Sequence, residues 1–214
     1  LSYNFCSLFK ESNLVSAENL VLPVMTLTPH CYRAMFANNP LFAVAPELPA
    51  TTLAQSCYRY MFQDASITTA PDLLATTLVL GCYDGMFNGC GSLNYIRCLA
   101  TNIDTVGTEA TAAWTQDVAT SGTFIKDANT EWIRGNSAIP TRWTVVDEGL
   151  KRPTISCDGL YITLNCGTSG SSIYYRLNEE GVFTIYSAPI SISADTICEI
   201  ARSEERRVGK ECRS

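Results

Sequence analysis

The stretches HCYRAMF (30–36), SCYRYMF (56–62) and GCYDGMF (81–87) share one pattern, Cys-Tyr-x-x-Met-Phe. Together with Phe9, the phenylalanines that close these copies are separated by 27, 26 and 25 residues. The near copies APELPATTL (45–53) and APDLLATTL (70–78) keep the same phase. Because one short unit cannot bury its own apolar face, units repeated in phase must stack on one another. The spacing therefore predicts a solenoid with one repeat per coil.

Each repeat reads as a short strand followed by a short helical turn. The segments 41–48, 67–74 and 93–100 are β-capable and partly alternating, and Pro46 and Pro71 prevent the first two from extending. In TTLAQSCYRYMF (51–62) the apolar residues follow an i, i+4, i+5, i+8 pattern, which fits a helix or a 3₁₀ segment. A period of 20–29 residues is typical of leucine-rich repeats. We therefore predict an α/β-type leucine-rich-repeat solenoid over residues 1–99.

Three repeated cysteines, Cys31, Cys57 and Cys82, fall in one column of the predicted stack. Core packing is the favoured interpretation, because a thiol is a small apolar group that fits between aromatic layers. A disulfide between coils and a metal column are the alternatives. Zinc sites use Cys or His ligands two to four residues apart, and neither this spacing nor a second histidine beside His30 occurs. No metal site is predicted.

The repeat fades in residues 100–147, which contain all three tryptophans, Trp114, Trp132 and Trp143. The last coil of a solenoid would expose its core, so a cap is needed there. We interpret this segment as that cap. The alternative is a sugar-stacking platform, which would make Trp132 and Trp143 ligand-binding residues. Exposure of the indole rings distinguishes the two interpretations.

Beyond a charged linker at residues 148–154 the sequence consists of short strand-like segments separated by turn residues. This pattern predicts a small all-β, Ig-like sandwich over residues 155–201. The stretch RSEERRVGKECRS (202–214) is charge-dense and patternless, and it resembles the translation of a sequencing adapter. We expect it to be a non-native tail, so that the sandwich is truncated before its last strand.

Two family resemblances follow from these motifs. The repeats, including Met-Phe-x-x-Cys-x-x-Leu (86–93), resemble BspA-type leucine-rich-repeat bacterial surface proteins over residues 1–147; Asn39 and Ala65 depart from the cysteine of that pattern. The segment from Ile173 to Ile197 resembles the chitobiase/β-hexosaminidase C-terminal-type module, which is accessory and carries no catalytic residues. The first resemblance implies an exported protein at the cell surface or outside the cell. Neither implies a cofactor.

The composition of the chain argues against several classes of binding partner and activity. A formal charge of −6 argues against nucleic acid, which rewards basic patches. No apolar run approaches the ~20 residues of a membrane helix, so we expect no membrane insertion. His30 has no partner motif for nucleophilic catalysis, and the carboxylates are scattered through the repeats. No catalytic residue is predicted.

The favoured function is therefore recognition or adhesion outside the cell, with a host or matrix protein or a glycan as the ligand. The alternative is an accessory, non-catalytic region of a larger carbohydrate-active enzyme. Arg33, Arg59 and Asp84 are binding candidates, because they follow the fixed Cys-Tyr pair and change charge between repeats. An ordinary solvated surface explains the same variation.

Overall fold

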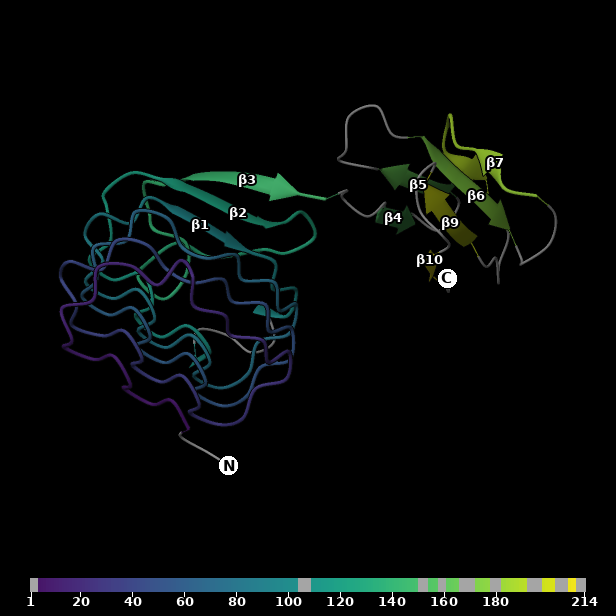
Figure 1. Ribbon diagram of the computed structural model, residues 1–214. Coiled ribbons are helices and arrows are strands. Elements are labelled where there is room, and N and C mark those ends of the chain that lie inside the picture. The colour runs from purple at the N-terminus through teal and green to yellow at the C-terminus, as the bar shows by residue number, and fades with distance from the viewer. Residues whose placement is uncertain are drawn as a thin grey trace. The chain divides into compact units, whose positions relative to one another are not determined.

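A computed structural model describes residues 4–103, 109–149, 154–157, 161–165, 172–177, 182–191, 198–202 and 208–210. The chain divides into two compact units, residues 1–149 and residues 150–214, and each is described by itself (Figure 1). The division falls inside the segment predicted as a linker. No helix among the described residues is long and apolar enough to cross a membrane.

The first unit is a stack of coils (Figure 1). We call each coil a rung and number the rungs that contain Phe9, Phe36, Phe62 and Phe87 as rungs 1 to 4. In the turn segments that contain the repeated motif, every second backbone N–H donates to a carbonyl of the next rung, as Phe36 does to Met61 at 2.9 Å. These bonds align equivalent residues, so that side chains of one kind form columns along the stack.

The phenylalanine alignment made from the sequence is confirmed by one such column. The ring centroids of Phe9 and Phe36 lie 5.6 Å apart, those of Phe36 and Phe62 5.6 Å, and those of Phe62 and Phe87 5.8 Å, with nearly parallel planes. A second column runs from Phe5 through the three repeated tyrosines to Trp114, again ring on ring. Most of these rings belong to the core of the stack, together with aliphatic, methionine and cysteine side chains.

The predicted helical or 3₁₀ segments are wrong, and with them the prediction of an α/β-type leucine-rich-repeat solenoid. Every element bounded within the described residues is a strand. Where a helix was expected, Ser56, Tyr60 and Asp64 have positive φ angles of 53°, 57° and 56°. An α-helix cannot contain a left-handed residue at every fourth position. The segment is instead a ribbon of consecutive turns.

The hydrogen bonds of the turn ribbon explain why its sequence pattern resembles that of a helix. Arg59 N donates to Ser56 O and Met61 N to Tyr58 O, each three residues back, whereas the residues between them donate to the next rung. The turn from Tyr58 to Met61 has left-handed Tyr60 as its third residue, as a type II turn requires, whereas the turn from Ser56 to Arg59 has no positive φ at its two central residues. This ribbon repeats every four residues and a helix every 3.6. Over eight residues the two patterns are nearly the same.

Only one of the three expected rung strands forms as a strand. Strand β1 (Tyr95–Cys98) pairs in parallel with β2 (Thr123–Asp127), which pairs with β3 (Thr144–Glu148). The expected strands 41–48 and 67–74 make only isolated parallel bridges, at Val44, Thr69 and Leu73. Both contain a proline, which lacks the N–H that a continuous ladder needs, and the segment 93–100 contains none.

The tryptophans extend the core beyond the last repeat. Trp114 stacks on Tyr83, and Trp132 stacks on Trp114 with ring centroids 5.6 Å apart. Trp114 Nε1 donates to Ala138 O and Trp143 Nε1 to Ala119 O, both at 2.8 Å. All three side chains are buried. These rings therefore continue the core beyond rung 4.

The described residues of the second unit form two antiparallel sheets. One has the order β10-β9-β6-β7 and the other the order β4-β5-β8. Residues of both sheets share one cluster, built around Ile162, Leu164 and Ile173. The strands are β4 (Thr154–Cys157), β5 (Tyr161–Asn165), β6 (Ile173–Leu177), β7 (Thr184–Ile185), β8 (Ile190–Ser191), β9 (Cys198–Arg202) and β10 (Val208–Lys210). Strand β10 lies within residues 202–214, the segment expected to be a non-native tail.

Candidate functional site

The candidates Arg59 and Asp84, which sit at equivalent places on rungs 3 and 4, are brought together by the stack. Arg59 Nε lies 2.9 Å from Asp84 Oδ2. The guanidinium also lies over the Tyr60 ring, 4.9 Å from its centroid, and donates to the Tyr60 hydroxyl at 3.3 Å. Hydrogen bonding to Tyr60 is the main cause that raises the pKa of Arg59. Burial raises the pKa of Asp84, against the opposing effect of Arg59 and Arg33.

These contacts show what the two charges do in the free protein: Arg59 and Asp84 neutralise each other across the rungs. Arg33, the third candidate, is half-buried on rung 2, and its charge acts on Asp84. A ligand at this place would have to compete with an existing ion pair. Their role in binding stays a prediction.

The candidates Trp132 and Trp143 lie in the core. Their exposed fractions are 9% and 2%. A sugar-stacking platform needs an exposed ring face, and the two indoles present almost none. Their burial favours the cap interpretation.

The repeated cysteines also line the core. The thiols of Cys31, Cys57 and Cys82 are free and buried. Burial raises the pKa of Cys82 from its ordinary value of 9.0 to about 11, and that of Cys90 to about 12. Such thiols are protonated near neutral pH and unreactive. Among the described residues, no three His, Cys, Asp or Glu side chains form a group that could hold a metal ion.

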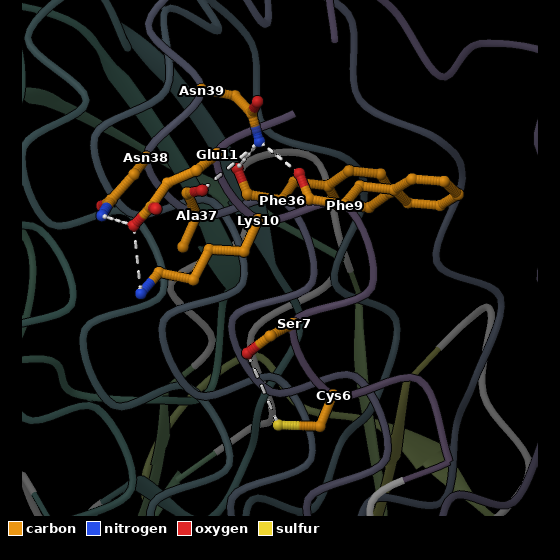
Figure 2. A network of polar contacts seen from close by, with 9 residues as sticks. All are labelled: Cys6, Ser7, Phe9, Lys10, Glu11, Phe36, Ala37, Asn38 and Asn39. Atoms are coloured by element: carbon orange, nitrogen blue, oxygen red, sulfur yellow. Dashed lines mark hydrogen bonds and ion pairs between the residues drawn. The ribbon is translucent and has the colours of Figure 1, made fainter. Parts of the chain in front are cut away.

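Another column of equivalent residues lies at the end of the turn ribbon. It consists of Asn39, Ala65 and Cys90, and two of these side chains make hydrogen bonds. Cys90 Sγ donates to Phe62 O at 2.9 Å. Asn39 Nδ2 donates to Phe9 O at 2.7 Å and to Phe36 O at 3.0 Å (Figure 2). Both side chains thus reach the carbonyl of the core phenylalanine one rung earlier. Asn39 replaces the cysteine of the repeat pattern in this bond.

The stack also carries a groove that the sequence did not predict as a site. Two pockets of about 350 and 340 Å³ share Glu47 and Pro49 and so join across three rungs. We call them together the lateral groove; it is lined by residues 18–23, 45–49, Pro71, Asp72 and Leu74. A third pocket of about 310 Å³ shares three of its lining residues, 18–20. The groove follows the proline-rich segments of the repeats.

Three carboxylates lie along the lateral groove: Glu18, Glu47 and Asp72. Asp72 Oδ2 accepts a hydrogen bond from Arg97 at 2.7 Å, and Arg97 also pairs with Glu148. Glu18 and Glu47 have no ion-pair partner among the described residues. The near copies APELP and APDLL, each with an acid at the same place, were the signal that could have located this surface.

Comparison of the chain with protein-family models, curated proteins and solved structures gives no match. The resemblances to BspA-type proteins and to the chitobiase-type module therefore stay predictions.

Proposed function

We propose that the protein is an exported recognition or adhesion protein, at the cell surface or in the extracellular space. It binds a protein or glycan ligand through the stacked rungs and has no catalysis of its own. The observation that carries the proposal is the lateral groove, because it crosses several rungs and its lining repeats with them. A stack offers such an extended surface without disturbing its core.

The exposed apolar side chains of the groove support this proposal. Val21 is 76% exposed and Leu74 37%, and both line the groove. Val24 and Met25, which follow the groove segment of rung 1, are also exposed. Single exposed apolar residues are common on proteins, but exposed apolar side chains that line a pocket are typical of an interaction site.

The proposal is tested on arrays of extracellular-matrix proteins and glycans probed with the labelled full chain. We expect saturable binding to at least one ligand class. Val21→Arg should abolish or strongly weaken it, because the new cation enters the groove. Val182→Arg, at an 85% exposed valine of the second unit, serves as the matched control. Absence of binding to both arrays would refute the proposal.

A further inference from the structure

The lateral groove has a lining that selects against a glycan. Among the described residues, its sides are aliphatic and proline residues with three carboxylates and one amide. The adjoining third pocket has one aromatic residue, Phe9, whose ring stacks on Phe36. Sugar rings are recognised largely through the faces of aromatic side chains, against which their axial C–H groups stack. Aliphatic walls instead suit the apolar side chains of a peptide.

Among the side chains that line the groove, only the amide of Asn19 is a hydrogen-bond donor when the carboxylates are ionised. Four of its lining residues, Pro23, Pro46, Pro49 and Pro71, have no backbone N–H. The carboxylates of Glu18, Glu47 and Asp72 accept hydrogen bonds and donate none when ionised. A ligand that supplies donors therefore fits this surface better than one that supplies acceptors.

The charges of the groove further restrict the class of ligand that fits it. Glu18 and Glu47 belong to adjacent rungs, are exposed, and have no ion-pair partner among the described residues. Within the part of the chain that the structure describes, no Lys or Arg lines the groove. Asp72 shows the contrasting case, because Arg97 neutralises it. Two uncompensated carboxylates beside apolar walls complement a cation carried on an apolar chain.

We propose that the lateral groove binds an extended peptide segment that carries Lys or Arg beside aliphatic residues, with its cations at Glu18 and Glu47. The inference rests on the proposed recognition function and specifies the ligand class. An extended conformation suits the groove because its pockets follow one another across the rungs. The peptide's aliphatic residues would pack against Leu20, Val21 and Leu74.

Three synthetic peptides of equal length test the charge requirement: repeats of Pro-Val-Lys, Pro-Val-Gln and Pro-Val-Glu. The prolines keep all three extended. Binding of each labelled peptide to the full chain is measured by fluorescence anisotropy. We expect binding of the lysine peptide, clearly weaker binding of the glutamine peptide and none of the glutamate peptide. Because screening shortens the reach of exposed charges, raising NaCl from about 20 to about 200 mM should weaken the lysine peptide's binding.

The double variant Glu18→Gln/Glu47→Gln tests the place of binding. An exposed ion pair contributes about 0.2–1 kcal/mol, so the loss of both should raise the Kd of the lysine peptide by about two- to thirtyfold. The matched control is Glu109→Gln/Glu131→Gln, which removes the same charge at two exposed positions outside the groove. The Kd of this control variant for the lysine peptide should stay within twofold of that of the unchanged protein.

Each result decides between the alternatives. Equal binding of the lysine and glutamine peptides, or equal effects of the two double variants, would overturn the inference. If the arrays show a ligand whose binding Val21→Arg abolishes but no lysine peptide binds, the inference fails and the recognition function stands. If the arrays show no ligand and no peptide binds, both fail.

Discussion

Asn39 donates from its side-chain amide to the backbone carbonyl of Phe9, 2.7 Å away and one rung earlier in the stack (Figure 2). The same nitrogen bonds Phe36 O, and the side chain is fully buried. The Ser12 hydroxyl donates to Phe9 O at 2.7 Å, and its oxygen lies 3.3 Å from the Asn39 carbonyl oxygen. One amide thus joins the first two rungs inside the core, where an unpaired carbonyl is costly.

Asn39→Ala should lower the free energy of unfolding by about 1–3 kcal/mol, because it leaves the carbonyls of Phe9, Phe36 and Ala37 with fewer partners. Asn39→Cys should recover part of this loss, since Cys90 makes the equivalent bond two rungs later. Urea denaturation measures both. Ala65 shows that an alanine fits sterically in this column. Equal stabilities for the alanine and cysteine variants would contradict the role of the bond.

Gly85 should tolerate no side chain. Its φ angle is +60°, and a Cβ at this place would lie 2.1 Å from the Tyr60 ring. We expect Gly85→Ala to cost more than the ~1–2 kcal/mol of a left-handed alanine, because the ring must also move. Ala34, at the equivalent place on rung 2, has a φ of 52°, so Ala34→Gly should stabilise the protein. Thermal unfolding of both variants checks these opposite signs.

The two stacked tryptophans should respond differently to the same substitution. Trp114→Phe removes the bond to Ala138 O and leaves that buried carbonyl with one partner fewer. Trp132 Nε1 is buried and has no hydrogen-bond partner among the described residues, so Trp132→Phe removes an unpaired donor. Both lose similar apolar area. We expect Trp114→Phe to cost about 1–3 kcal/mol more than Trp132→Phe in urea denaturation; the reverse order would contradict the hydrogen-bond assignment.

Alkaline pH should destabilise the stack. Burial raises the pKa of Cys82 from 9.0 to about 11, so the unfolded chain loses this proton first as the pH rises. The contribution of Cys82 to stability is complete below pH 9 and is lost progressively between pH 9 and about pH 11. The slope is at most about 1.4 kcal/mol per pH unit for one thiol. Cys82→Ala should flatten the decline, measured by urea denaturation from pH 8 upward.

The ion pair of Arg59 with Asp84 should contribute little stability. Both side chains are partly exposed, and exposed pairs contribute about 0.2–1 kcal/mol. A double-mutant cycle with Arg59→Gln and Asp84→Asn measures the coupling directly. A value within this range is expected, and it should fall in high salt because screening weakens exposed charges. A coupling above about 2 kcal/mol would contradict the picture of a partly solvated pair.

Much of the stack could be inferred from spacing. Phe9, Phe36, Phe62 and Phe87 recur in one phase, and their rings form the column that this phase requires. The helical interpretation of residues 51–62 failed because periods of 4 and 3.6 residues diverge too slowly over so short a segment. Gly81, Gly85 and Gly89 held the missing signal: they occupy successive left-handed positions of the ribbon. Glycines four residues apart favour repeated type II turns over a helix.

The amino-acid sequence by itself determined the length of the rung and the side chains that face inward, because burial requires apolar residues at equivalent places of every copy. Only the tertiary structure decided the backbone of each rung, since half of the N–H groups in the turn ribbon bond to another rung some 25 residues away. The lateral groove likewise arises only when Glu47 and Pro49 of one rung come beside residues of its two neighbours. Bonds and surfaces between rungs do not exist in any single repeat, so no single repeat could reveal them.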